Sequence, residues 1–492
     1  MAEAKKKKDL YLVHTAIGLA ITALFWVLPP IEPITPVGMK CVGAFLGMVY
    51  LWSMVDTLWP SIFGLFMLGI SGIDPAGLNS VWLNAVGNFT VLLVMFALVL
   101  FGAVHEVGDT MYIARWFLTK KVFKGRPFVF IAIFYVCCGV LSALLSPITS
   151  LIILWPIAIS LTKTLGLTRE DKIWSWFFVG MFLVSTLMQP FFPFMGAQLV
   201  PLSAFQGMTA QMGTPMEVPM LQYMAVNLIM TVLIMTIYIL AIKLLRVDVS
   251  KLKAIDPAMI EAQMQLPPMS KVQKIYLIMI PCYIAALLLP NFLKGLWAPF
   301  GFLAQLGPLG VTVLFILIFL IVRIDGKPLL DFKEMAYRQM NWGIFFMIAA
   351  AVYGANTLSN EATGVVPFLI QVLNPILGGQ SEMGFVAIMF LVALLITNFA
   401  NNAAMAVVLL PVVLAFSNQL GISPIPVALG VTLMVFVAML TPAASPHAGM
   451  MHGRKDLYST GEILKIGFPM CLITWALYSF VGYPLMKLLL GV

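Results

Sequence analysis

The stretch that decides the fold reads SALLSPITS over residues 142–150, and it returns as TNFANNAAM over residues 397–405. An offset of 255 (397 − 142) places Ser142 on Thr397, Pro156 on Pro411 and Gly166 on Gly421. Each copy is a polar tip inside a long apolar run. Broken apolar segments at corresponding places in two halves of a chain indicate the binding site of a secondary transporter.

The composition of the chain is that of a polytopic membrane protein. Of its 492 residues, 61% are hydrophobic and only 10% are charged, and the mean hydropathy is +1.01. This excludes a soluble protein. The net charge of +8 lies in short runs beside apolar spans, as positive-inside bias predicts, and is no sign of nucleic-acid binding. The five cysteines lie in apolar stretches without metal or disulfide spacing and are interpreted as packing residues.

Apolar runs along the chain predict eleven membrane spans, each crossing taking about 20 helical residues. We expect these spans at 11–28, 37–54, 57–72, 88–106, 172–199, 221–246, 275–293, 301–323, 336–358, 424–446 and 464–486. The two tip-bearing regions, 127–166 and 381–421, are additional. The second arm of the first region, residues 151–165, would measure about 22 Å, against ~30 Å of hydrocarbon. Each region is therefore predicted to be a re-entrant helical hairpin, and the fold class is all-α.

Basic residues predict opposite orientations for the two hairpins. Lysines and arginines flank the first hairpin on both sides, whereas residues 374–383 and 416–426 beside the second contain none. Positive-inside bias then places the first pair of flanks in the cytoplasm and the second pair outside. The basic run Lys5–Lys8 puts the N-terminus in the cytoplasm, and eleven spans put the C-terminus outside. Lys294 is the one basic residue expected in an external loop.

This topology divides the chain into two inverted repeats in a plasma (inner) membrane. Residues 1–36 would form a basic segment and the first span. Residues 37–246 would form the first repeat with hairpin 127–166, and residues 301–492 the second repeat with hairpin 381–421. Residues 247–300 would connect them through a cytoplasmic linker and one span. After each hairpin the next span is interrupted by proline and small polar residues, at 189–193 and 441–447.

The two tips can attract an anion without charged side chains. Where one helix ends and another begins near the bilayer midplane, the new helix presents free N–H groups and about half a positive charge. Two such N-termini from opposite leaflets would form one anion site. The bland alternative is local capping: Ser146 and Asn401 are good N-cap residues, and the hydroxyls of Ser142 and Thr397 can bond nearby carbonyls. The candidate site residues are Ser146, Thr149, Asn401, Asn402, Ser142, Thr397, Thr441, Ser445, Pro446 and His447.

Several other residues have a structural interpretation as well as a functional one. His447 is either an anion-facing group or a satisfied interior histidine. The acidic residues Glu106, Asp109 and Glu361 lie near helix ends and are interpreted as structural ion pairs or solvated groups. The 33 methionines are apolar filling.

Paired hairpins, each followed by a proline-broken span, resemble the divalent anion/sodium symporter family of di- and tricarboxylate transporters, which includes the INDY proteins. The resemblance covers nearly the whole chain. That family carries Ser-Asn-Thr at each tip; here the corresponding residues are Ser146-Pro147-Ile148 and Asn401-Asn402-Ala403, so only Ser146 and Asn402 are identical. Ala444-Ser445-Pro446 resembles the family's Ala-Thr-Pro in the second broken span, whereas Gln189–Pro193 replaces its glycine-rich first break.

The resemblance implies a scaffold that forms a homodimer and a transport part that slides across the membrane in an elevator motion. It also implies that tip asparagines and hydroxyls bind the substrate carboxylates, with candidate sodium positions near Thr397, Asn402 and Ala444. The departures at Pro147, Ile148 and Ala403 favour relatives that exchange carboxylates without sodium.

The leading hypothesis is therefore a transporter of di- or tricarboxylates, as an exchanger or a sodium-coupled symporter, with no cofactor except a sodium ion in the symport alternative. Expected partners are a small carboxylate, membrane lipid and a second copy of the chain. An inorganic-anion or arsenite permease on the same architecture is one alternative, and a channel is another. A membrane enzyme is disfavoured, because the spans contain no paired carboxylates, metal spacing or activated serine.

Overall fold

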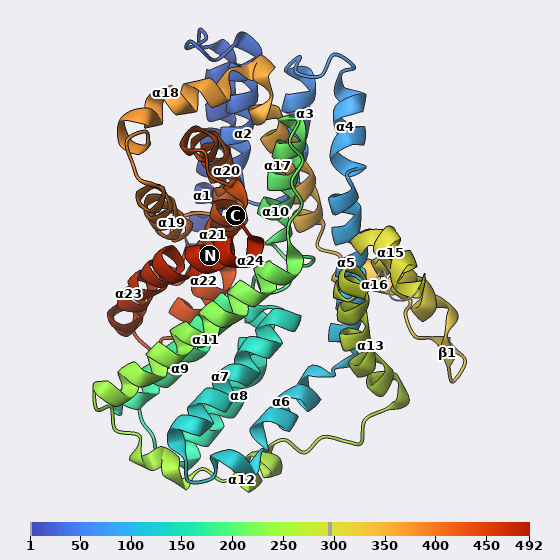
Figure 1. The fold of residues 1–492 in the computed structure, drawn as a ribbon. Helices are drawn as coiled ribbons and strands as arrows, with labels where there is room; N and C mark the ends of the chain where they lie inside the picture. The colour runs from blue at the N-terminus through green and yellow to red at the C-terminus, as the bar shows by residue number, and fades with distance from the viewer. Residues whose placement is uncertain (1, 294–297) are drawn as a thin grey trace.

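The computed structural model describes residues 2–293 and 298–492, and Lys294 lies outside them. Over the described residues the chain is almost entirely helical (Figure 1). Its two short strands, β1 (Arg323–Ile324) and β2 (Lys327–Pro328), pair antiparallel around a turn in which Asp325 and Gly326 have positive φ. Eleven of the described helices are long and apolar enough to cross a membrane. The predicted class, a polytopic all-α membrane protein, is confirmed.

The first half of the chain runs through both arms of the first hairpin and its following broken span. Its helices are α1 (Ala2–Val27), α2 (Pro36–Met54), α3 (Leu58–Ile70), α4 (Leu78–Val86), α5 (Phe89–Val107), α6 (Thr110–Leu118), η1 (Lys121–Phe123), α7 (Pro127–Leu144), α8 (Pro147–Thr164), α9 (Lys172–Met188), α10 (Leu199–Gln211) and α11 (Met220–Leu244).

The connecting segment and the second half contain the remaining helices. These are η2 (Ser250–Ala254), α12 (Pro257–Gln263), α13 (Lys271–Leu288), α14 (Pro290–Leu293), α15 (Ala298–Ile321), α16 (Phe332–Gln339), α17 (Trp342–Ser359), η3 (Glu361–Thr363), α18 (Val365–Leu377), α19 (Glu382–Thr397), α20 (Asn402–Leu420), α21 (Pro424–Val435), α22 (Pro446–Gly453), α23 (Thr460–Leu477), η4 (Tyr478–Gly482) and α24 (Tyr483–Leu490).

Both tip-bearing regions are helical hairpins, and α7 packs against α8 as α19 packs against α20. The second arms are longer than the sequence predicted. Helix α8 begins at Pro147, immediately after the tip, so its 18 residues extend about 27 Å. The difference arises because Ser146 and Pro147 start a helix together, one as the cap and the other as the first helical residue. Arm length therefore does not by itself distinguish a hairpin from two full crossings, and re-entrance stays a prediction.

The eleven long helices of the structure are not the same segments as the eleven predicted spans. They include α7, α8 and α20, and they leave out α3, α9 and α21, which have 13, 17 and 12 residues. Helices α9 and α21 are short because each stops at an irregular segment, 189–198 and 436–445, before α10 and α22 begin. Both predicted interruptions are therefore present as breaks between two helices.

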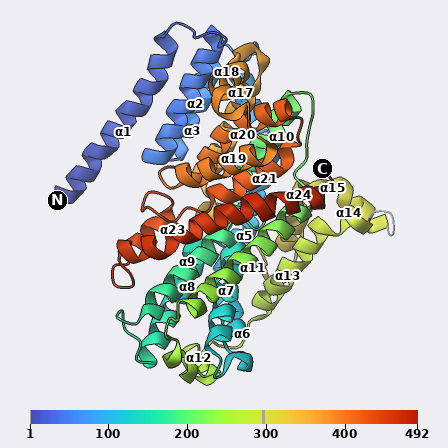
Figure 2. The same cartoon turned by 60° about the vertical axis from the view of Figure 1, so that its left-hand side comes forward.

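The two halves of the chain are interleaved rather than stacked as separate bodies. Helix α10 of the first half packs against α17 and α20 of the second, and α22 of the second half packs against α8 of the first. Figure 1 shows α10 beside α17, and Figure 2 shows α10 beside α20 from another side. A short helix that follows each break is thus held by the opposite half.

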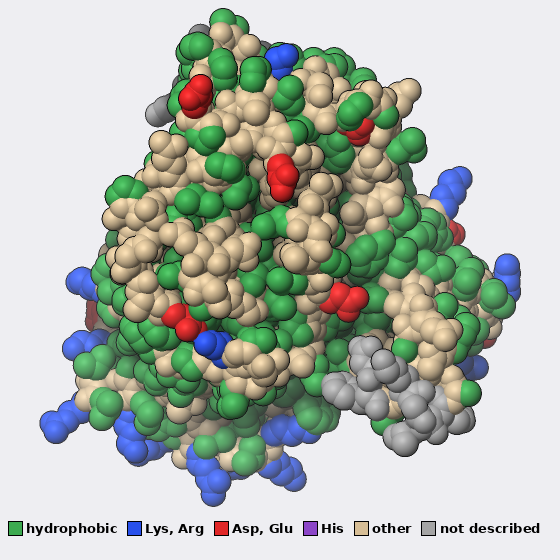
Figure 3. Space-filling view, turned by 45° about the horizontal axis from the view of Figure 1, so that its top comes forward, with side chains coloured by type: hydrophobic (Ala, Val, Ile, Leu, Met, Phe, Trp, Pro, Cys, Tyr) green, Lys and Arg blue, Asp and Glu red, His purple; other side chains and the backbone are tan. Residues whose placement is uncertain are grey.

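Lysines and arginines gather at one end of the molecule, which we call the basic face, formed by the loops that contain residues 119–126, 166–171, 245–270, 322–341 and 454–459. Figure 3 shows lysine and arginine side chains along its lower edge, with others at its right-hand edge. Ion pairs tie the loops together: Lys124 to Asp256 at 2.5 Å and Lys251 to Asp171 at 2.8 Å. The Lys251 ammonium hydrogen-bonds the Asp171 carboxylate and thereby lowers the pKa of Asp171.

Candidate functional site

The first tip is a two-residue turn whose polar groups cap the helix that follows. Ser146 has extended backbone, and its hydroxyl accepts a hydrogen bond from the Thr149 N–H at 3.2 Å. The two hydroxyls of Ser146 and Thr149 lie 3.0 Å apart. One turn before the tip, the Ser142 hydroxyl donates to the Ser185 carbonyl in α9 at 2.6 Å. The capping interpretation of Ser146 is therefore confirmed, and Ser142 ties the tip to the first broken span.

A cavity of about 260 Å³ lies against the first tip. Its walls come from three segments: one face of α5, the first tip and the end of the first break. The lining residues are Val94, Ala97, Leu98, Phe101, Gly102, His105, Leu144, Leu145, Thr149, Met195, Gly196 and Leu199. The starts of α8 and α10 thus border one cavity, whose lining contains no lysine or arginine. Helix starts favour negative charge, so the cavity is suited to an anion.

His105 is the one ionisable residue in that lining. The sequence predicted the span that became α5, but it did not predict that His105 or any other residue of α5 belongs to the site. His105 lies in the last turn of α5 and is exposed. The next residue, Glu106, is paired with Arg338 of the basic face at 2.9 Å. The cavity therefore extends along α5 toward the basic face. The available sequence signal was a helix bearing Ala97 and Gly102, whose small side chains leave space beside a partner.

The second tip is closed by its own polar contacts. The Thr397 hydroxyl lies 2.9 Å from the Asn402 side-chain oxygen and also donates to the Val435 carbonyl at the end of α21. Asn401 caps α20 by accepting from the Ala404 N–H at 3.1 Å, and its own N–H donates to the Ser53 hydroxyl of α2 at 3.2 Å. The capping interpretation of Asn401 is confirmed. Asn402, only 8% exposed, lies directly behind the cap.

The second break is fastened to the second tip through one asparagine that sequence reasoning passed over. The Asn398 side-chain oxygen accepts from the Leu440 N–H at 2.8 Å, and its backbone carbonyl accepts from the Thr441 hydroxyl. Ser445 caps α22 by accepting from the Ala448 N–H at 3.1 Å, with Pro446 at the first helical position. Thr441 and Ser445 thus hold the break in place, and Pro446 is exposed beside them.

His447 is buried next to the first half of the chain. Its side chain is 3% exposed, and its ring centre lies 5.5 Å from that of Phe182 in α9. Its Nε2 atom has no hydrogen-bond partner among the described residues. Ala444, near which a sodium position was predicted, is buried as well. His447 therefore lies between the two broken spans as an interior group, away from the cavity lining.

The predicted site residues fall into two groups. Thr149 lines the cavity at the first tip, with Ser146 bonded to it. The residues of the second tip and second break, from Thr397 to His447, contribute nothing to that lining. A single pocket shared by both tips therefore stays a prediction.

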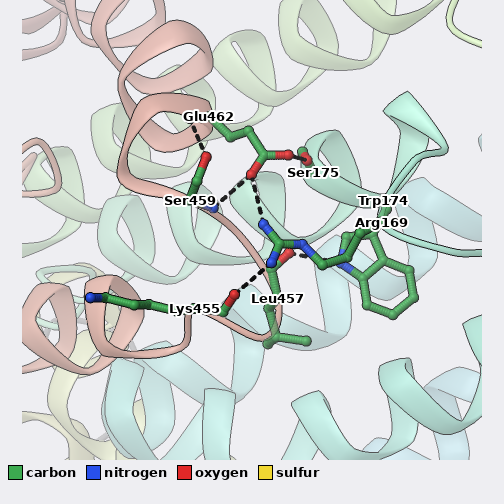
Figure 4. A network of polar contacts seen from close by, with 7 residues as sticks. All are labelled: Arg169, Trp174, Ser175, Lys455, Leu457, Ser459 and Glu462. Atoms are coloured by element: carbon green, nitrogen blue, oxygen red, sulfur yellow. Dashed lines mark hydrogen bonds and ion pairs between the residues drawn. The ribbon is translucent and has the colours of Figure 1, made fainter.

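The loops at the start of α9 and α23 form a polar network that joins the two broken spans (Figure 4). Arg169 donates to the Lys455 carbonyl at 2.7 Å and pairs with Glu462 at 3.3 Å. The Trp174 indole donates to the Leu457 carbonyl at 2.8 Å, and the Ser175 hydroxyl donates to Glu462. The loops before α9 and after α22 therefore lie together at the basic face.

These features define an integral membrane transporter: apolar helices, two helices broken inside apolar runs, and an anion-suited cavity at a helical hairpin. A model of the citrate transporter family (CitMHS) matches residues 9–434, well over half of the chain. The chain belongs to that family.

One curated relative is named "Uncharacterized transporter YfbS" and comes from Escherichia coli (strain K12). It is 30% identical over 143 residues, which are 29% of this chain. The match covers only 23% of that protein's length. Both names describe transporters rather than enzymes, in agreement with the sequence.

Proposed function

We propose that this protein is a secondary active transporter that moves di- or tricarboxylate anions across the membrane. The observation that carries the proposal is the cavity at the first tip, where two helix starts meet and the lining contains no lysine or arginine. Helix N-termini bind carboxylates without a fixed cationic side chain, so a bound anion can also leave again. The family description, citrate transporter, supports a carboxylate as the substrate class.

In this proposal the first tip makes the contacts on the cavity side. The hydroxyls of Ser146 and Thr149 and the Ile148 N–H at the start of α8 would receive one carboxylate. Asn401 and Asn402 at the second tip would receive another when the substrate is enclosed. Thr441 and Ser445 would hold the break that carries these groups, and His447 would stay an interior residue between the broken spans.

The transport cycle we propose is an elevator motion within a homodimer, as in the divalent anion/sodium symporters that the sequence resembles. The moving part would contain the two hairpins and the two broken spans, which the network around Arg169 and Glu462 joins. With the N-terminus and the basic face in the cytoplasm, the cavity at the first tip would open inward past His105.

Coupling is proposed to be exchange of one carboxylate for another, with sodium symport as the alternative. A sodium site would draw on the oxygens near Thr397, Asn402 and Ala444. The Asn402 side-chain oxygen already lies 2.9 Å from the Thr397 hydroxyl, and Pro147 and Ile148 contribute no side-chain oxygen to the first tip. Both facts favour a sodium-independent cycle.

Proteoliposome uptake tests the proposal directly. Vesicles are loaded with unlabelled citrate or succinate and supplied with the labelled anion outside, in sodium or choline buffer. Uptake that requires internal anion supports exchange, and uptake that requires sodium supports symport. If no carboxylate is taken up, with or without internal anion, but arsenite or an inorganic anion is, the substrate is arsenite or an inorganic anion and not a carboxylate.

A further inference from the structure

A second cavity, of about 680 Å³, lies between α6, α7 and α13, near the basic face. Its walls are mainly apolar and aromatic, and they include Trp116 and Phe117 of α6, Val140 and Leu144 of α7, and Leu277 and Ile280 of α13. We call this cavity the lateral slot. Figure 1 shows α6 between α7 and α13, with α12 near its lower end.

The lateral slot lies next to surface that faces lipid. Val136, one turn before Val140 on α7, is 52% exposed, and Ile278, next to Leu277 on α13, is 64% exposed. Exposed apolar side chains on membrane helices contact acyl chains, because no other apolar phase is available to them. The slot is therefore a recess in the lipid-facing surface, deep enough to receive part of a lipid molecule.

Cationic side chains border the polar end of the slot. Arg115 lines it and pairs with Glu261 at 3.0 Å. The Lys120 ammonium lies 3.7 Å from the centre of the Trp116 ring, a geometry that holds the cation by the face of the indole. An apolar recess with cations at its end toward the basic face matches the two parts of an anionic phospholipid.

We propose that the lateral slot binds one anionic phospholipid, with an acyl chain between α7 and α13 and the headgroup phosphate at Arg115 and Lys120. Leu144 lines both the lateral slot and the cavity at the first tip. The bound chain therefore supports the wall that separates the two and lies beside the end of the first hairpin. This binding is independent of which anion the protein transports.

Native mass spectrometry of the purified full-length protein tests the assignment, after washing in detergent and addition of phosphatidylglycerol or phosphatidylcholine. The wild type is expected to retain one phosphatidylglycerol in preference to phosphatidylcholine. The variant Val140→Trp fills the slot and is expected to abolish that retention. Its matched control, Val232→Trp, adds the same side chain at an exposed valine of α11, outside the slot lining, and is expected to retain the lipid.

Two charge-reversal variants separate the headgroup contact from the apolar contact. Lys120→Glu is expected to lower the preference for phosphatidylglycerol by about fivefold or more, the scale of the attraction between one basic side chain and an anionic headgroup. Lys121→Glu changes the net charge equally on the adjacent, exposed residue and is expected to leave the preference unchanged.

Three results would overturn the proposal: no lipid retained by the wild type, equal retention of both lipids, or equal loss in Val232→Trp and Val140→Trp. If Val140→Trp fails to fold, Leu277→Phe fills the same slot from α13 and takes its place. Because the readout is bound lipid, failure of the transport assay would leave this result interpretable.

Discussion

The two hairpin tips occupy equivalent places in the sequence but differ in what their polar groups face. At the first tip, Thr149 borders an open cavity and the nearest ionisable group, His105, belongs to another helix. At the second, the Asn402 side-chain oxygen lies 2.9 Å from the Thr397 hydroxyl, and the N–H of Asn401 is bonded to α2. One tip is therefore accessible and the other is closed. Two copies of one motif can therefore differ in accessibility. Such a difference is what a central site open to only one side of the membrane would require.

The substitution with the largest expected effect on this comparison removes the side-chain amide of Asn402 at the closed second tip. We expect Asn402→Ala to reduce carboxylate uptake by about 10- to 100-fold, the loss of one hydrogen bond to a charged group. Initial uptake rates in proteoliposomes measure the effect. Asn418→Ala, an exposed asparagine on the same helix, is the matched control. Equal rates for both variants would remove the second tip from the substrate site.

Removing a polar group from the open first tip is expected to reduce uptake less than the Asn402 substitution does. Thr149→Val keeps the size of the side chain and loses a hydroxyl whose neighbour Ser146 remains to cap α8. Uptake should fall about two- to tenfold, the scale of one neutral hydrogen bond. Thr164→Val, at the exposed end of α8, is the control. A larger loss at Thr149 than at Asn402 would reverse the assignment of the principal carboxylate contact.

His105→Gln tests whether the open cavity distinguishes substrates by charge. The change removes the one ionisable group of the lining but keeps a hydrogen-bond donor. We expect KM for a tricarboxylate to rise by about two- to fivefold, the scale of an exposed charge pair, while KM for a dicarboxylate stays constant. Competition between labelled citrate and unlabelled succinate measures both values. A parallel rise in the two constants would assign His105 to the shape of the cavity mouth.

The comparison extends to the turns that lead toward the hairpins, where Asp109 and Glu361 correspond. Asp109 is fully buried and neither carboxylate oxygen has a hydrogen-bond partner among the described residues, whereas Glu361 is exposed. Burial raises the pKa of Asp109 from 3.8 to about 6. The folded state thus holds this proton more tightly than the unfolded chain, so the contribution of Asp109 to stability is fully present below pH 4 and is lost as pH rises through about 6.

Asp109→Asn should remove that fall in stability. At pH 7.5 the variant is expected to unfold a few degrees above the wild type in detergent, and the difference should vanish near pH 4. Thermal unfolding followed by tryptophan fluorescence at both pH values measures it. Glu361→Gln is expected to show no such difference. Equal midpoints for Asp109→Asn and wild type at pH 7.5 would indicate that Asp109 has a partner in the membrane.

Local chemistry made the helical elements predictable. Composition determined the class, and the Ser146-Pro147 and Asn401 signals located the starts of α8 and α20, because caps depend on adjacent residues only. The proline-rich breaks were found for the same reason. The prediction of a solvated or ion-paired acid was correct for Glu106, which pairs with Arg338. It was wrong for Asp109, which is buried with no hydrogen-bond partner in the part of the chain that the structure describes.

What the sequence did not predict depends on contacts between distant segments. The wall of α5 around the first tip and the Asn398 contact to the second break lack a periodic or motif signal. The short helices α4, α6 and α18 each have one apolar face, but the span prediction considered only long apolar runs. Packing between helices far apart in the chain determines which side chains face a cavity. Of the site, the sequence therefore located both tips and both breaks, but not the cavity that the first tip and the first break border.

The interleaving of the two halves has a consequence for how the protein is made. Helix α10 leaves the ribosome well before α17 and α20, the helices that cover it. At about 5–20 residues added per second, the first half waits about 7 to 40 seconds in the bilayer before α17 and α20 are complete, and until then α10 lacks these two partners. Biogenesis of the first half is therefore incomplete until the second has been inserted, and truncated chains should be substrates for membrane quality control.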